Sequence, residues 1–120
     1  MGLDHWIVAD TKTDKNVPII DWRKANHIHN WFVNNVQDGV DDQNSYVVTR
    51  EKLELFVELC ESVIASPASA KEVLPTASGY FFGSTDYDEW YFEDLKDTVA
   101  VLKQALEDED YITFYYGCWW

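Results

Sequence analysis

The chain has 120 residues and a formal net charge of −13, from 22 acidic and 9 basic residues. A chain of this length forms one domain and buries roughly two-thirds of the surface of its unfolded state. The acidic balance excludes unaided binding to nucleic acid or to an anionic membrane, because both need a basic surface. No apolar run approaches the ~20 residues of a membrane-spanning helix, so we expect no contact with a membrane.

Residues 3–9 are rich in β-branched and aromatic side chains and predict a first strand, and the polar residues 10–18 predict a turn. From residue 22 to 39 the apolar side chains recur with the period of a helix. Asp21 is the expected N-cap of this helix and Gly39 its expected end. The predicted apolar face holds Trp22, Ala25, Ile28, Phe32, Val33 and Val36.

Residues 46–48 predict either an edge strand or the approach to a second helix. Thr49 is the expected N-cap of that helix, and Pro67 lies beyond its end. Residues 80–82, between two glycines, predict another short strand. The apolar face of the second helix holds Leu53, Phe56, Val57, Cys60, Val63 and Ile64, and is extended by Leu55 and Leu59 so that two sides are expected to be covered.

Asp86 and Glu89 are spaced as a capping pair and predict the start of a third helix that runs to residue 106. Residues 111–116 are mostly aromatic or β-branched and predict a final strand. The apolar face of the third helix holds Trp90 or Tyr91, Leu95, Val99, Leu102 and Leu106.

These elements predict an α+β fold in a single domain, residues 1–120, with about three helices packed on a small antiparallel sheet that includes both termini. The strand at residues 3–8 is expected to pair with residues 111–116. We find neither an internal repeat nor a linker that would divide the chain.

A polar stripe accompanies the predicted helix at 22–39 and suggests a small binding pocket, to which Tyr80 could contribute. Alternatively this stripe is a solvated face, and Arg23 forms an ion pair with an acidic residue from 86–93. The candidate pocket residues are Arg23, His27, Asn30 and Tyr80, with Asn34 continuing the stripe.

No spacing typical of a metal site or a catalytic site occurs in the sequence. His27 and His29 are two residues apart, so on a helix they point in different directions and cannot bind one ion together. The cysteines, Cys60 and Cys118, belong to no CxxC pattern and are expected to be reduced and packed. We therefore predict no catalytic residue, no metal and no cofactor.

Residues 86–110 hold ten acidic residues against two lysines, a net charge of −8 out of the total of −13. The acids at 107–110 follow a helix C-terminus, where the helix dipole disfavours them. Stability does not explain this run, so we expect a surface that binds a cationic protein. The predicted binding residues are Asp88, Glu89, Trp90, Asp94, Asp97, Glu107, Asp108, Glu109, Asp110, Trp119 and Trp120.

Four segments together resemble a family of small uncharacterised proteins that phages and prophages encode. They are MGLD at the start, WRKANHIHNWFVNNVQDG, LPTASGYFFGSTDYDE and the aromatic end YYGCWW. The resemblance implies an intracellular, single-domain protein that acts in the cytoplasm of an infected bacterial host. It implies no reaction and no catalytic residue.

The leading interpretation is a non-enzymatic phage protein that blocks a basic host protein, such as a nucleic-acid-binding defence effector, as an anti-CRISPR-like partial DNA mimic. One alternative is a small-ligand or nucleotide-binding protein or enzyme with a polar pocket around Arg23, His27 and Asn30. A further alternative is a homo-oligomeric structural protein, of which a homodimer is the simplest case.

Overall fold

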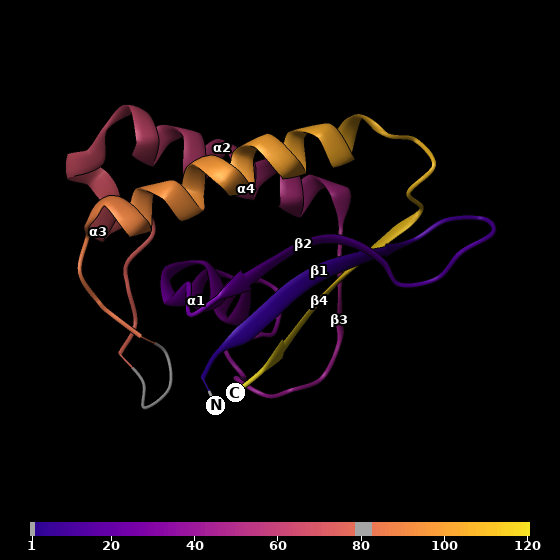
Figure 1. Cartoon of the computed structure of the whole chain (residues 1–120), viewed down its shortest axis with the longest axis horizontal. Coiled ribbons are helices and arrows are strands. Elements are labelled where there is room, and N and C mark those ends of the chain that lie inside the picture. Colours follow the sequence, from indigo (N-terminus) through magenta and orange to yellow (C-terminus); the bar gives the residue numbers. More distant parts are fainter. Residues whose placement is uncertain (1, 79–82) are drawn as a thin grey trace.

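The computed structural model describes residues 2–78 and 83–120. Four α-helices and a four-stranded antiparallel sheet lie within these residues, so the predicted α+β fold is confirmed, with one short helix more than expected. The sheet order is β2-β1-β4-β3, and the central strands β1 (Asp4–Asp10) and β4 (Thr113–Trp119) bring the two ends of the chain together (Figure 1). The predicted pairing of the first strand with the last is also confirmed.

The predicted turn at residues 10–18 is shorter than expected, because strand β2 (Val17–Arg23) begins within it. Strand β2 forms a hairpin with β1 and pairs Trp22 with His5. Pro18 is tolerated in β2 because this is an edge strand, and the register shifts close by, between Ile7 and Val8. The prediction that Trp22 begins a helix is therefore wrong.

Helix α1 (Asn26–Asn35) is shorter than predicted at both ends. Asp21 is not its N-cap, because it lies in the hairpin, paired with Trp6. Lys24 has a positive φ of 57° and turns the chain from strand to helix. At the other end, the Gly39 N–H donates to the carbonyl of Val33 at 2.8 Å, so Gly39 closes the turn that follows the helix.

Strand β3 (Tyr46–Val48) is an edge strand beside β4, one of the two predicted alternatives. The next helix, α2 (Arg50–Ala65), begins as predicted, because the Thr49 hydroxyl accepts from the Lys52 N–H at 3.2 Å. Leu55 is 47% exposed, so the expectation that two sides of this helix are covered is wrong. The chain then forms a 3₁₀ turn, η1 (Pro67–Ser69), and the short helix α3 (Ala70–Val73). The predicted strand at 80–82 lies outside the described residues.

Helix α4 (Glu89–Glu107) is capped by Asp88, whose carboxylate accepts from the Tyr91 N–H at 3.1 Å. The prediction that Asp86 is the cap is wrong by two residues, because the carboxylate that bonds the first turn is that of Asp88. Of the two aromatic alternatives, Tyr91 is buried and Trp90 is exposed. The buried face of α4 holds Tyr91, Leu95, Thr98, Leu102 and Ala105.

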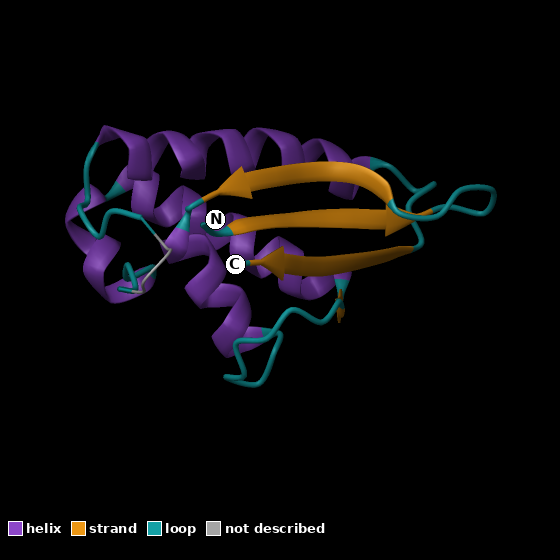
Figure 2. Ribbon diagram, turned by 60° about the horizontal axis from the view of Figure 1, so that its bottom comes forward, coloured by secondary structure: helices purple, strands orange, loops and turns teal. Residues whose placement is uncertain are grey.

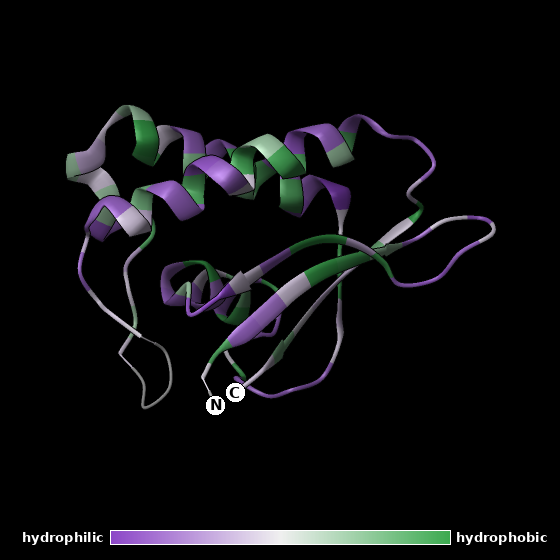
Figure 3. Ribbon diagram, viewed as in Figure 1, coloured by the Kyte–Doolittle hydropathy of each residue, from purple (hydrophilic) through white to green (hydrophobic). Residues whose placement is uncertain are grey.

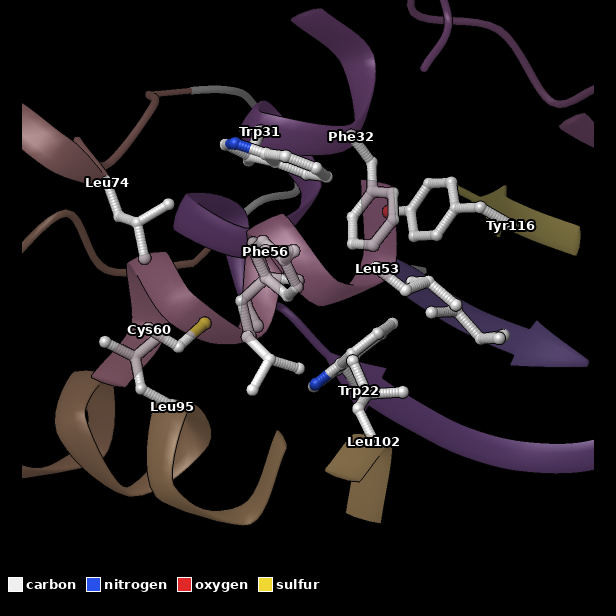
Figure 4. Close-up of a cluster of buried hydrophobic side chains, with 14 of the residues drawn as sticks. Trp22, Trp31, Phe32, Leu53, Phe56, Cys60, Leu74, Leu95, Leu102 and Tyr116 are labelled. Atoms are coloured by element: carbon white, nitrogen blue, oxygen red, sulfur yellow. The ribbon is translucent and has the colours of Figure 1, made fainter. Parts of the chain in front are cut away.

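The helices cover one face of the sheet, as Figure 2 shows. Helices α2 and α4 run side by side. Helix α1 lies near the start of β1 and the end of β4, on the side of the two chain termini (Figure 1). In the core, the Phe32 ring stacks on Tyr116 with centroids 4.1 Å apart and an angle of 3° (Figure 4). The Trp22 indole N–H donates to the Thr98 hydroxyl at 2.8 Å and so joins β2 to α4.

Arg50, at the start of α2, holds the end of α4 in place. Its guanidinium donates to the carbonyls of Leu106 at 2.6 Å and Tyr111 at 2.8 Å, and it lies 5.2 Å from the centroid of the Phe114 ring. The bond to Leu106 satisfies a carbonyl of the last turn of α4 that has no partner within the helix, and the positive charge opposes the negative end of the helix dipole.

We expect the substitution Arg50→Met to lower the free energy of unfolding by about 2 kcal/mol, because the carbonyls lose charged donors. The matched control is Arg23→Met, since the ion pair from Arg23 Nε to Asp4 is 4.0 Å long and its side chains are 74% and 59% exposed. That control should change the free energy by no more than about 0.5 kcal/mol. Urea denaturation of both variants measures the difference, and equal losses would contradict the role given to Arg50.

Candidate functional site

The outward face of α4 carries acidic side chains in its first half and at its last residue. Glu89, Glu93, Asp97 and Glu107 are all exposed. Each residue turns a helix by about 100°, so these four side chains lie within roughly 80° of one another around the helix axis. The face spans about 27 Å from Glu89 to Glu107, at a rise of about 1.5 Å per residue.

Helix α2 places a second acidic stripe beside the first. Glu51, Glu54, Glu58 and Glu61 recur every three or four residues, so they share one side of α2. Glu61 accepts from Lys103 of α4 at 2.9 Å, which joins the two stripes across the helix pair. Figure 3 shows hydrophilic and hydrophobic segments alternating along both helices. The stripe on α2 was not among the predicted binding residues, although the spacing of its glutamates is visible in the sequence.

We call the two stripes together the acidic face, defined by Glu51, Glu54, Glu58 and Glu61 of α2 and Glu89, Glu93, Asp97 and Glu107 of α4. Its two lysines are already engaged, Lys96 by Glu93 at 3.8 Å and Lys103 by Glu61. The acidic loop Asp108–Asp110 follows directly and is exposed. The acidic face and this loop therefore give this side of the protein an excess of negative charge, with an interval at residues 98–106 of α4 that holds no acidic side chain.

Of the eight acidic residues predicted to bind a partner, none forms an ion pair with another described residue. Seven of them are exposed and lie on α4, at its cap or in the loop that follows. The eighth, Asp94, is half-buried beside the start of α4. Its pKa is raised from 3.8 to about 6 by burial and by the neighbouring carboxylates of Asp97 and Asp88.

A hollow of about 280 Å³ lies at the start of α4 and contains part of the predicted polar pocket. Arg23 and His27 both line it, but Asn30 does not, and Tyr80 lies outside the described residues. Arg23 forms its ion pair with Asp4, so the expected pairing with an acid from 86–93 is wrong. The hollow is also lined by Lys24, Thr76, Ser84, Asp86, Asp88, Trp90, Tyr91 and Asp94.

His27 is 4% exposed and stacks on Tyr91 with ring centroids 4.1 Å apart. Its Nε2 atom is buried without a hydrogen-bond partner in the described part of the chain. Burial lowers the pKa of His27 from 6.5 to about 4, although the carboxylate of Asp88 acts in the opposite direction. His27 is therefore neutral at pH 7, because burial disfavours its charged form by more than Asp88 stabilises it.

The exposed tryptophans fall into two separate places. Trp90 is 70% exposed and stands beside the acidic residues at the start of α4. Trp119 and Trp120 lie at the end of β4, beside the N-terminus and away from α2 and α4 (Figure 1). The indole N–H of Trp120 donates to Asp41 at 3.1 Å. The structure thus places Trp90 with the predicted acidic residues and separates the terminal pair from them.

Polar side chains form a hydrogen-bonded chain between the sheet and α1. His29 Nε2 lies 2.9 Å from an Asp41 oxygen, His29 Nδ1 lies 2.6 Å from the Tyr116 hydroxyl, and that hydroxyl lies 3.0 Å from His5 Nδ1. Burial lowers the pKa of both His5 and His29 below the ordinary value of 6.5. The contact of His29 with Asp41 is therefore a hydrogen bond from a neutral imidazole.

The Asp41 carboxylate accepts, so the proton of neutral His29 lies on Nε2 and its Nδ1 accepts from the Tyr116 O–H. The Tyr116 oxygen then accepts from His5 Nδ1–H, which leaves the buried His5 Nε2 as an acceptor without a partner among the described residues. These hydrogen bonds could not be predicted from the sequence, because their partners lie up to 111 positions apart.

Both cysteines are free and buried, as expected. Cys60 lies in the apolar core, where burial raises the pKa of its thiol. Cys118 differs, because its thiol donates to the Asp42 carbonyl at 3.0 Å. Burial and the nearby carboxylates of Asp41 and Asp42 raise the pKa of Cys118 to about 11, so neither thiol is set up as a nucleophile.

None of the described helices is both long enough and apolar enough to span a membrane. The chain matches no protein-family model, no curated protein and no solved structure.

We predict that the buried His27 makes the free energy of unfolding decrease in acid. Between pH 6.5 and 4 the unfolded chain binds a proton at this position that the folded chain does not, so its contribution to stability falls as the pH falls. Between pH 7 and pH 5 the free energy of unfolding should therefore fall by about 2 kcal/mol less in His27→Gln than in the unmodified protein. Urea denaturation at the two pH values measures this, and an unchanged pH dependence would contradict it.

Proposed function

We propose that the chain is a non-enzymatic, phage-encoded binding protein that blocks a basic host protein. The observation that carries this proposal is the acidic face together with the loop Asp108–Asp110. Its carboxylates are exposed, and most of them make no ion pair within the described residues. A surface of this kind repels nucleic acid and attracts a protein with a positive potential.

The dimensions of the acidic face suit a site that ordinarily holds nucleic acid. Its first and last carboxylates on α4, Glu89 and Glu107, are separated by about 27 Å along the helix, which is the length of about eight nucleotides of one DNA strand at 3.4 Å each. The stripe on α2 adds a second row of carboxylates beside the first, so the surface presents two lines of negative charge. We therefore propose partial mimicry of DNA, with a nucleic-acid-binding defence effector such as a CRISPR nuclease as the target.

Trp90 supplies an anchor for such a partner, since its large side chain is 70% exposed beside Asp88 and Glu89. Exposed tryptophan is typical of the energetically important centre of an interface. Carboxylates around it would accelerate encounter and make binding sensitive to salt.

The hollow lined by Arg23 and His27 supports a second candidate function, the binding of a small polar ligand. The observation in its favour is His27 Nε2, which is buried in the wall of the hollow without a described hydrogen-bond partner. A nucleotide or metabolite that increases the melting temperature of the protein, but not that of His27→Gln, would support this function. If no compound in a broad screen increases the melting temperature in this way, the ligand-binding function is excluded.

The inhibitor proposal is tested with a charge-neutralised variant of the acidic face. The substitutions Glu89→Gln, Glu93→Gln, Asp97→Asn and Glu107→Gln remove four negative charges without a change of shape. The matched control removes four charges elsewhere, by Asp14→Asn, Asp21→Asn, Asp38→Asn and Glu72→Gln, all at exposed positions. The measurement is the displacement of labelled DNA from a purified CRISPR effector at several salt concentrations.

We expect the unmodified chain to displace the DNA at low salt, with weaker competition as salt increases. The variant of the acidic face should compete at least roughly tenfold less well, because several charges of the interface are lost, whereas the control should stay within about threefold. No displacement by the unmodified chain from any member of a panel of effectors, or equal loss in both variants, would overturn the proposal.

A further inference from the structure

We propose that His29, Asp41 and Cys118 form a binding site for a transition-metal ion of the zinc class. The three residues come from α1, from the loop between α1 and β3, and from β4. One ligand atom of each, an imidazole nitrogen, a carboxylate oxygen and the thiol sulfur, lies within 4.8 Å of the other two. Within the described residues no other group brings three such donors this close together.

The donor chemistry selects the class of ion. Imidazole, thiolate and carboxylate together suit zinc, whereas calcium and magnesium take oxygen ligands alone. Three protein ligands leave one position of a tetrahedral site for water. Asp41 faces solvent with a side chain that is 34% exposed, while His29 and Cys118 are buried, so the ion would enter from the side of Asp41.

The distances need only a small adjustment. Bonds of 2.0–2.3 Å to a tetrahedral ion place donor atoms about 3.3–3.6 Å apart. His29 Nε2 and the Asp41 oxygen are 2.9 Å apart, and every pair in the group lies within 4.8 Å. Asp41 belongs to an exposed loop. A rotation of its side chain would lengthen the distance from its oxygen to His29 Nε2 and bring the carboxylate toward the Cys118 sulfur.

The surroundings of His29 support ligation through Nε2. A metal-bound histidine ordinarily donates its other ring N–H to a neighbouring oxygen, which fixes the orientation of the ring. Here His29 Nδ1 lies 2.6 Å from the Tyr116 hydroxyl, which can accept that proton and donate its own to His5 Nδ1 at 3.0 Å. Metal binding would therefore reverse the direction of the whole chain of hydrogen bonds.

The test uses Co²⁺ as a spectroscopic substitute for Zn²⁺. Titration of the metal-free full chain should produce, at one equivalent, the near-ultraviolet charge-transfer band of a cobalt–thiolate bond and visible bands typical of four-coordination. Addition of Zn²⁺ should abolish both. If Co²⁺ at millimolar concentration produces no thiolate band, the proposal is overturned.

The ligands are assigned with three variants and a matched control. Cys118→Ser should lose the charge-transfer band, and Cys60→Ser should keep it, because Cys60 has no such neighbours. Asp41→Asn, at a partly exposed position that leaves the core intact, should weaken Co²⁺ binding at least tenfold. Tyr116→Phe should weaken it roughly 10- to 100-fold by releasing the orientation of His29. A band that survives in Cys118→Ser, or equal affinity in Asp41→Asn and the unmodified chain, would overturn the site.

Discussion

The contact between Phe32 of α1 and Tyr116 of β4 is the interaction on which the rest of the structure depends. The rings are parallel to within 3° and join the helix to one of the two central strands of the sheet (Figure 4). The same tyrosine places its hydroxyl between His29 and His5. One residue thus closes the apolar core with its ring and organises the buried polar groups with its oxygen, which fixes α1 in both position and rotation.

The buried polar groups restrict how the core can be arranged. His5, His29 and Tyr116 have little contact with water, and each leaves a polar atom without compensation if its neighbour shifts. Strand β1 places His5 opposite Cys118, so the register of the central strands decides whether the chain of hydrogen bonds exists. A slip of one residue would turn His5 to the uncovered face of the sheet, and the penalty for this makes the pairing of the two terminal strands specific.

Local patterns in the sequence predicted most of the elements, and tertiary contacts decided where the predictions were wrong. Thr49 and the strands near both ends were identified correctly, because caps and alternation depend on neighbours in the chain. The helix expected from Trp22 failed because the alternation within β2 resembles part of a helical period, and pairing with β1 favours the strand. The glutamates of α2 follow a helical spacing that is visible in the sequence. The proximity of His29, Asp41 and Cys118 could not be predicted in the same way, because contacts between α1, the loop after it and β4 are absent from any local pattern.

The fold tolerates the acidic face because basic residues offset part of the repulsion among its carboxylates. Residues 107–110 place four carboxylates at a helix end where the dipole is negative, and each such interaction costs about 0.3–1 kcal/mol at an exposed site. Arg50 donates to the Leu106 carbonyl of that end from the first turn of α2 and so places a positive charge beside it. The lysines on the outer surface are instead neutralised by Glu61 and Glu93. Arg50 and the two lysines thus offset part of the repulsion among the carboxylates, while the acidic residues still outnumber the basic ones and keep the surface potential negative.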